Sequence, residues 1–291
     1  MKVRAIALTT SALVAVAALA APASAGDYVG KINLGAGYTW DNYDGGEGDV
    51  DNNFSAIYGS GSVNIPYNDV VNLQLDVFSA ASMDNDGDGL ENSYGGSGLG
   101  VHLNYRDAQG ALGVFGTLGR ANDGGTTDEG HVVFAAGIEG QYFCNEWTLR
   151  GQVGLLDADD NSQLIQDAGF IDLGADYYAS SKLKLSGSVG YMDGATSGTD
   201  DPDDVTHWNW VLGAEYLFGK SVPVSTYLEY RGQSTETSNN GGTYWEVDTH
   251  TVNVGVRFYF GGNDLMKADR DGAGMTIQDI ITRPRNDNVS F

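Results

Sequence analysis

The chain has 291 residues and carries 15 Lys and Arg against 39 Asp and Glu, a formal net charge of −24. Such an acidic chain cannot hold nucleic acid by neutralising phosphates, so we expect no nucleic-acid partner. The single cysteine, Cys144, excludes an internal disulfide framework. The 42 glycines are interleaved with 16 Tyr, 10 Phe and 5 Trp, which indicates strands and not a flexible linker.

Residues 1–25 are predicted to be a secretory signal peptide. Lys2 and Arg4 form a positive start, an apolar run follows, and Ala-Ser-Ala ends the segment as a small-residue cleavage site. The apolar run is too short to cross a membrane as a helix. We therefore expect an exported chain that begins near Gly26. Without Lys2 and Arg4, 13 basic residues remain against 39 acidic ones, a net charge of −26.

Apolar and polar residues alternate with a period of two through most of the remaining chain, which predicts β-strands. In the last such segment, Val252, Val254 and Val256 alternate with Asn253 and Gly255. Each segment is about ten to thirteen residues long, which suits a tilted strand that crosses a bilayer. Twelve segments share the pattern, near 28–40, 53–65, 69–81, 94–106, 111–121, 131–143, 146–157, 168–179, 182–192, 206–218, 222–233 and 248–260.

The connections between these segments alternate strictly between short and long. An up-and-down barrel in an outer membrane has this feature, with tight periplasmic turns and longer outer loops. A soluble sandwich with Greek-key crossings has no reason to produce it. The predicted long loops together hold 24 acidic residues and no Lys or Arg; they are 41–52, 82–93, 121–130, 157–168, 193–206 and 232–248.

These observations predict an all-β fold: a transmembrane, antiparallel, up-and-down β-barrel of about 12 strands, with short periplasmic turns and long acidic outer loops. Its apolar face lies on lipid and its polar face on a lumen, and closure pairs every backbone group, as lipid requires. A water-soluble barrel with an apolar interior is the alternative, but strand length and loop alternation disfavour it. We expect the signal peptide at 1–25, the barrel at 26–260 and a polar periplasmic C-terminal tail at 261–291.

The polar face of the predicted strands carries charges of both signs. A mixed lumen fits a narrow channel with transverse charges that tune ion choice, and it fits equally a closed barrel filled by ion pairs. Twelve strands lie between the filled eight-stranded barrels and the open sixteen-stranded ones. The charged residues expected to line the lumen are Lys31, Asp76, Arg106, Arg120, Glu139, Arg150, Asp172, Asp176, Lys182, Lys184, Glu215, Glu229, Arg231 and Arg257.

The last predicted strand ends in Asn-Val-Gly-Val-Arg-Phe-Tyr-Phe, residues 253–260. With this motif, the chain resembles the outer-membrane porin-like β-barrel proteins of Gram-negative bacteria over about 28–260. The resemblance implies that Asn253, Gly255, Phe258 and Phe260 form an assembly signal for the barrel-insertion machinery; an ordinary lipid-facing strand would have the same residues. It further implies an outer-membrane location in contact with lipid and lipopolysaccharide. The family's signal usually ends the chain, whereas about thirty residues follow here.

We expect a passive diffusion channel for small hydrophilic solutes or ions, with a preference for cations because of the acidic outer loops. A closed structural or surface-interaction barrel is the alternative. An outer-membrane lipid hydrolase needs a serine activated by a histidine near the outer lipid boundary. His207 and His250 fall near that rim, but no serine motif of the phospholipase barrels is present. We therefore predict neither enzymatic activity nor a cofactor.

The stretch 84–92, Asp-Asn-Asp-Gly-Asp-Gly-Leu-Glu-Asn, begins like an EF-hand calcium loop. The twelfth position of that loop should be a bidentate Glu, but here it is Gly95. Predicted strands also replace the two flanking helices. Both observations argue against an EF-hand, and what is left open is a partial Ca²⁺ or Mg²⁺ site at Asp84, Asp86 and Asp88 in an outer loop.

Overall fold

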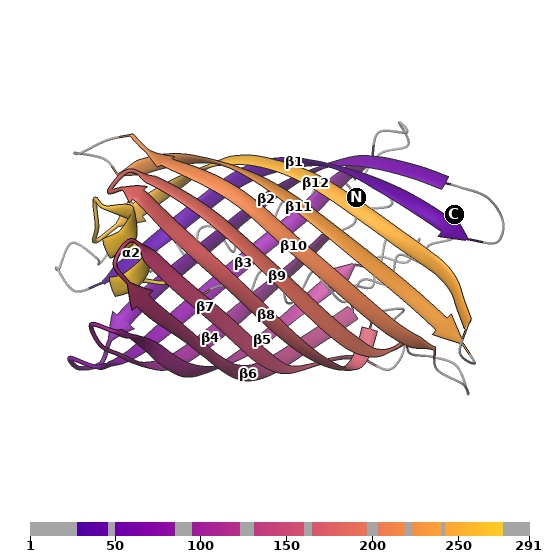
Figure 1. The fold of residues 1–291 in the computed structure, drawn as a ribbon, viewed down its shortest axis with the longest axis horizontal. Coiled ribbons are helices and arrows are strands. Elements are labelled where there is room, and N and C mark those ends of the chain that lie inside the picture. The colour runs from indigo at the N-terminus through magenta and orange to yellow at the C-terminus, as the bar shows by residue number, and fades with distance from the viewer. Residues whose placement is uncertain are drawn as a thin grey trace, which may run out of the picture.

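A computed structural model describes residues 28–45, 50–84, 95–122, 131–159, 165–196, 203–218, 223–239 and 242–275. The predicted signal peptide lies outside these residues. Figure 1 shows long strands that run obliquely around one axis, with the helix α2 (Leu265–Asp271) at one end. No helix in the described ranges is long and apolar enough to cross a membrane.

The strands form one closed antiparallel barrel in which sequence neighbours pair and β1 pairs with β12 (Figure 1). The prediction of a 12-stranded up-and-down barrel is confirmed. Closure leaves no strand edge unpaired, which is the condition for a sheet in lipid. The strands are β1 Val29–Gly45, β2 Val50–Pro66, β3 Val71–Asp84, β4 Gly95–Arg106, β5 Gly110–Asn122, β6 His131–Cys144, β7 Trp147–Ala158, β8 Ile165–Ser180, β9 Leu183–Thr196, β10 Asp204–Leu217, β11 Val224–Asn239 and β12 Gly242–Phe260.

Several strands continue past their predicted ends on the long-loop side. β11 ends at Asn239 and β12 begins at Gly242, so the predicted loop 232–248 is wrong in extent. Its three acidic residues, Glu236, Glu246 and Asp248, lie on paired strand, and Glu236 is directly opposite Glu246. The alternation of apolar residues stops where the strands leave the bilayer, but the backbone pairing continues beyond it.

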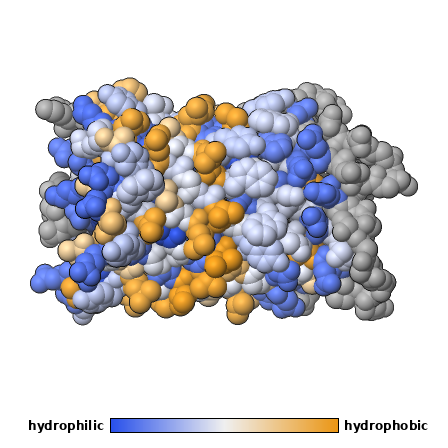
Figure 2. All heavy atoms as spheres, viewed as in Figure 1, coloured by the Kyte–Doolittle hydropathy of each residue, from blue (hydrophilic) through white to orange (hydrophobic). Residues whose placement is uncertain are grey.

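The outer face of the barrel is apolar, as predicted. Leu99, Leu112 and Leu155 are 63%, 67% and 72% exposed, values that would be costly in water. Figure 2 shows hydrophobic residues as a band around the middle of this face, with more hydrophilic residues toward both ends. On β12, Val254 and Phe258 are exposed while Asn253 is buried inside. The sequence alternation therefore separates a lipid face from a lumen face.

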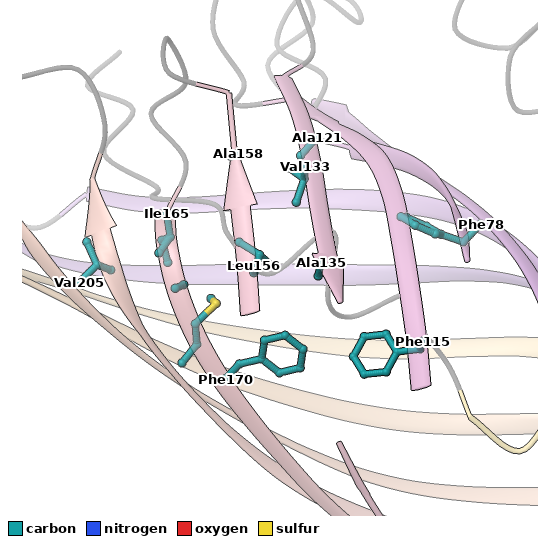
Figure 3. Close-up of a cluster of buried hydrophobic side chains, with 12 residues drawn as sticks. Phe78, Phe115, Ala121, Val133, Ala135, Leu156, Ala158, Ile165, Phe170 and Val205 are labelled. Carbon is teal, nitrogen blue, oxygen red and sulfur yellow. The ribbon is translucent and has the colours of Figure 1, made fainter. Parts of the chain in front are cut away.

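Part of the lumen face is apolar, which the sequence pattern did not predict. Twelve buried side chains from β3 and β5 to β10 form one cluster inside the barrel. Figure 3 shows Phe115 and Phe170 pointing toward each other, with their ring centroids 6.2 Å apart. Ala121, Ala158 and Ile165 of the same cluster lie near the long-loop ends of their strands. This cluster fills the long-loop side of the lumen along those strands.

Residues 261–275, here called the C-terminal segment, fold into the opposite mouth of the barrel, where the short turns lie (Figure 1). Asp264 caps α2 by accepting a hydrogen bond from the Lys267 backbone N–H at 2.9 Å. Leu265 is fully buried and packs with Tyr178, Leu217 and other apolar residues of the wall. The prediction placed 261–291 in the periplasm; the structure places its described part, residues 261–275, in the mouth at the short-turn end of the barrel. That this end faces the periplasm stays a prediction.

Candidate functional site: the barrel lumen

Most of the predicted lumen residues lie inside the barrel. Inward-facing alternation on each strand places them there, and the cavity described below is lined by many of them. Buried on the inner face are Asp76, Arg106, Glu139, Asp176, Lys184 and Glu215. Partly exposed on the same face are Lys31, Arg150, Asp172, Glu229, Arg231 and Arg257. These twelve residues carry six positive and six negative charges, so the wall itself is close to neutral.

Two predicted lumen residues are elsewhere. Arg120 is exposed and shares its strand face with Leu112 and Leu118, which point to lipid. Its position two residues before the end of β5 allows the long side chain to extend to the membrane interface. Lys182 lies in the turn between β8 and β9 and not on a strand. The strand phase corrects the assignment of Arg120, and the position of the turn between Ser180 and Leu183 corrects that of Lys182.

One wall of the lumen is an ion-pair network centred on Glu215 of β10. Its carboxylate accepts hydrogen bonds from the Ser225 and Tyr259 hydroxyls, each at 2.6 Å. It also pairs with Lys184 at 3.1 Å and with the Arg257 guanidinium. Four donors on one buried carboxylate compensate the cost of removing its charge from water. The network fixes the basic side chains in place across β9 to β12.

A second wall holds His102 between two carboxylates. The Nε2 atom lies 3.0 Å from Asp76 Oδ2, and Nδ1 lies 2.8 Å from Glu139 Oε1. A ring that donates from both nitrogens is an imidazolium, so the trio carries one positive and two negative charges. Gln74 and Gln152 donate further hydrogen bonds to the carboxylates, at 2.9 and 3.0 Å. The sequence analysis did not count His102 among the charged lumen residues. Its two partners, Asp76 and Glu139, are distant in the sequence, so nothing near His102 in the chain indicates that the ring is charged.

Between these walls the lumen contains a cavity of about 140 Å³. That volume holds several water molecules. Its charged lining includes the ion pairs Arg150–Asp176 at 3.3 Å and Arg231–Glu229 at 2.5 Å. Asp269 and Gly274 of the C-terminal segment complete the lining. The cavity is therefore polar on its walls and bounded at one end by residues that follow the barrel.

The C-terminal segment crosses the mouth and bonds to strands around it. The Arg106 guanidinium donates to the carbonyl oxygens of Arg270 and Gly272, and Asn64 donates to that of Asp271. On another side, Arg270 donates to the carbonyl oxygens of Asn145 and Trp147. These contacts reach β2, β4, β7 and the turn between β6 and β7. The segment therefore narrows the short-turn end of the lumen.

A family model that matches most of the barrel identifies the family of the chain. Residues 67–240, more than half of the chain, match the family model of the Gram-negative porins. The chain belongs to the Gram-negative porin family. A search of curated proteins finds no match. The porin is thus an outer-membrane β-barrel protein, in contact with lipid over its apolar outer face.

Three solved structures are similar to the porin at low sequence identity. A loop-deletion variant of OmpT, an outer membrane protein of Vibrio cholerae, is 15% identical, with a TM-score of 0.41 over 79% of this chain and 99% of that chain. The KdgM porin in complex with disordered oligogalacturonate is 10% identical, with a TM-score of 0.42 over 77% and 98%. A variant of the TodX monoaromatic hydrocarbon channel is 8% identical, with a TM-score of 0.44 over 80% and 90%.

The predicted assembly residues of the porin divide between the two faces of β12. Asn253 is buried on the lumen side and Phe258 is 41% exposed on the lipid side. Phe260, the last residue of the strand, pairs with Gly30 of β1, so the motif lies at the closure of the barrel. Whether the insertion machinery reads these residues stays a prediction.

Gly255 has a packing role at this closure. The Tyr227 hydroxyl donates to the Tyr58 hydroxyl at 2.8 Å, across β12 and β1. The two tyrosines cover Gly255 and Gly35, which are aligned with them in the strand register. A Cβ atom on Gly255 would stand 2.5 Å from both the Tyr227 hydroxyl and the Leu34 carbonyl oxygen. Glycine at these two positions therefore makes room for a tyrosine bridge over the closing strands.

The two rim histidines lie on opposite faces of the porin wall. His207 is buried inside and its Nδ1 atom is 2.9 Å from the Thr235 hydroxyl. His250 shares the lipid face with Val252 and is 2.9 Å from the Tyr230 hydroxyl. The two rings therefore cannot serve one site.

Of the predicted metal residues, Asp86 and Asp88 lie outside the described residues, as does the side chain of Asp84, so that site stays a prediction.

Proposed function

We propose that this porin is a passive diffusion channel for small hydrophilic solutes or ions. The observation that carries the proposal is the charged cavity, large enough for several water molecules, inside a barrel of the porin family. Opposed ion pairs such as Glu215 with Lys184 and Arg150 with Asp176 form transverse charges along it. Such charges let hydrated ions and polar solutes exchange water contacts for wall contacts at moderate cost.

The same geometry favours small solutes. The C-terminal segment narrows the mouth at the short-turn end, and the apolar cluster around Phe115 and Phe170 fills the long-loop side along β5 to β10. The open part of the lumen is therefore displaced toward the wall formed by β9 to β12 with β1 and β2. A solute must fit within that part without displacing packed side chains.

The cation preference rests on the long-loop ends of the strands. Acidic residues gather there, whereas the charged wall of the lumen is nearly neutral. Glu236 and Glu246 are opposite each other in the strand register, and Asp44 of β1 is opposite Glu246. Glu236 and Glu246 share the strand phase of the outward-facing Leu228 and Val252, so they lie on the outside of the barrel. Carboxylates around that end raise the local concentration of cations near the mouth before they enter.

A closed structural or surface-interaction barrel is the second candidate. It is favoured by the same two features that narrow the lumen, namely the C-terminal segment and the apolar cluster. A lipid hydrolase is less well supported, because His207 and His250 lie on opposite faces of the wall. We therefore propose a transport role and not an enzymatic one.

Conductance of the refolded protein in a planar lipid bilayer tests these candidates. A channel gives stepwise currents, and a salt gradient then gives a reversal potential with the sign of cation preference. An anion-selective reversal potential contradicts the cation preference and leaves the channel standing. Absence of conductance in correctly refolded protein supports the closed barrel. Hydrolysis of a thioester lipid, tested in parallel, would support the hydrolase.

A further inference from the structure

The Asp269 carboxylate of the C-terminal segment is held by groups that belong to the barrel wall. Its Oδ2 atom lies 2.7 Å from Lys184 Nζ and accepts a hydrogen bond from the Tyr178 hydroxyl at 3.1 Å. Its Oδ1 atom lies 3.6 Å from Lys31 Nζ. Asp269 is 5% exposed, so the contacts are shielded from water. Two ammonium groups and a hydroxyl from β1, β8 and β9 thus converge on one carboxylate.

The converging groups are part of the barrel, but the carboxylate is not. The C-terminal segment is joined to the barrel through the end of β12 and adds no strand to the ladder. Its helix α2 has seven residues, fewer than the roughly 12 that an isolated helix needs to be even marginally stable. Its order therefore depends on contacts with the wall. Lys31 and Lys184 belong to strands whose backbone pairing does not involve the segment.

Removal of the Asp269 carboxylate would leave the Lys31 ammonium without its ion-pair partner. Lys184 would keep Glu215, which lies 3.1 Å away. Among the described residues, Asp269 is the carboxylate that pairs with Lys31. A buried ammonium without a partner strongly favours a new anion. The cavity of the lumen reaches this point, since Lys31, Lys184 and Asp269 are all part of its lining.

From this geometry we propose that Lys31, Lys184 and Tyr178 form a carboxylate-binding site in the lumen, which the porin's own Asp269 fills in this structure. When Asp269 is withdrawn, a small solute that carries a carboxylate binds in its place. The site deepens the proposed channel function and rests on it, because the solute reaches the site through the lumen. The acidic outer end attracts positively charged groups of a solute, whereas this basic inner site binds its carboxylate.

The tethered Asp269 competes strongly with any free carboxylate. A group on a short tether has an effective concentration in the millimolar range or above. A free carboxylate at lower concentration therefore leaves the wild-type site as it is. A variant that lacks the Asp269 carboxylate, but keeps the rest of the chain, removes this competition and opens a space of the same size.

The test compares Asp269→Ala with Asp269→Asn in the full-length, refolded protein. Alanine leaves a space that acetate fits, whereas asparagine keeps the space filled by a neutral amide of the same shape. We expect acetate at about 100 mM to raise the thermal unfolding midpoint of Asp269→Ala by several degrees. Acetamide, which matches acetate without its charge, should have no effect. Wild type and Asp269→Asn should not respond to acetate beyond the response to equimolar chloride.

A second substitution links the effect to the lysines. Lys31→Gln combined with Asp269→Ala should lose the response to acetate. If Asp269→Ala does not refold in buffer alone, the refolded fraction in acetate against acetamide measures the same binding. Equal responses of Asp269→Ala to acetate, acetamide and chloride would overturn the proposal.

Conductance in sodium chloride separates the site from the channel. An acetate response in protein that never conducts supports the carboxylate site and contradicts the channel. Conductance by Asp269→Ala without any acetate response overturns the site and leaves the channel function intact.

Discussion

Glycine at two positions of the closing strands allows two tyrosines to meet across them. Gly255 and Gly35 lie side by side in β12 and β1, under the hydrogen bond between Tyr227 and Tyr58. The sequence reading assigned Gly255 to an assembly signal, whereas the structure gives it a packing reason as well. The two roles can be separated with purified protein that refolds without the insertion machinery. A substitution that disturbs packing destabilises the refolded barrel, whereas one that disturbs only the signal does not.

We expect Gly255→Ala to destabilise the refolded barrel by about 1–3 kcal/mol, the usual cost of overpacking. The new Cβ atom would stand 2.5 Å from the Tyr227 hydroxyl and from a backbone oxygen. Urea unfolding in lipid vesicles, followed by tryptophan fluorescence, measures the loss. Gly116→Ala is the matched control, because a Cβ atom there meets nothing within 4 Å. Wild-type stability in vitro together with poor assembly in cells would point to the signal role alone.

His102 shows how a buried charge is compensated inside the lumen. Its imidazolium separates Asp76 from Glu139, and all three side chains are almost fully buried. We expect His102→Ala to cost about 3–5 kcal/mol of unfolding free energy, because two carboxylates are left without their shared cation.

The control is His131→Ala at the rim, where the Asp159 partner is 46% exposed in its side chain, so a cost of about 0–1 kcal/mol is expected. Addition of Asp76→Asn and Glu139→Gln should recover part of the His102→Ala loss. A loss in His102→Ala no larger than in His131→Ala would contradict the ionic trio.

Arg120 marks the limit of sequence reading for single residues. Its polarity suggested the lumen, but the alternation with Leu118 and Leu112 already placed it on the lipid face. Alternation along the strand is a stronger guide than residue polarity to which face a side chain occupies, because every second residue points to the same face. Phe115 is the converse case, an apolar residue that the same phase places inside.

At the level of elements, the strands were predictable and the C-terminal segment was not. A strand that separates lipid from water carries a period of two over its whole length, so the bounds agree to within a few residues in the bilayer. The extensions of β11 and β12 beyond the bilayer lose that constraint and were read as loop. Residues 261–275 bury only a few apolar side chains. Their other contacts are with backbone oxygens and with charged side chains that are far away in the sequence, and such contacts leave no local sequence pattern.

We expect the C-terminal segment to stay docked as the pH falls from 7 to about 5. Burial opposes ionisation of Asp269, but Lys184, Lys31 and Arg257 outweigh it and hold the pKa of this carboxyl well below its ordinary value. A lowered pKa in the folded state means that the docking energy is present above the ordinary pKa of aspartate, about 4. It is lost only as the pH falls below that value toward the lowered one. Further ionisable groups that interact with this carboxylate are Tyr178, Glu215, Arg106 and Tyr259.

An environment-sensitive dye on Cys144 can report docking. This cysteine is exposed and next to Asn145, whose carbonyl oxygen accepts from Arg270. The dye signal of wild type should be constant between pH 7 and 5 and change only below about pH 4. Asp269→Asn should lose the part of this change below pH 4 that comes from protonation of Asp269. Any change that persists in Asp269→Asn comes from other titrating groups. Release near pH 6 would contradict the ionised Asp269 at the dock.

At the scale of the whole molecule, charge is separated by position along the barrel axis. The predicted lumen residues that lie inside carry six positive and six negative charges, many of them in ion pairs, so the wall presents little net field. Among the described residues, Glu236, Glu246 and Asp248 lie at the long-loop ends of β11 and β12, and the sequence places further acidic residues in the segments that join the strands at that end. If the proposed channel function holds, we expect a permeating ion to be selected mainly by its concentration at the mouth and only weakly inside the lumen.

This arrangement predicts a cation preference that weakens with salt. Exposed charges act over the screening length, which falls from about 30 Å at 0.01 M salt to about 3 Å at 1 M. We expect reversal potentials to indicate strong cation preference at low salt and little at 1 M. Replacement of Asp84, Asp86 and Asp88 by Asn should lower the low-salt preference and leave the 1 M value unchanged, whereas the lumen variant Glu229→Gln should shift both. A preference that is equal at both salt concentrations would place selection inside the lumen, where side chains are too close to the ion for salt to screen them.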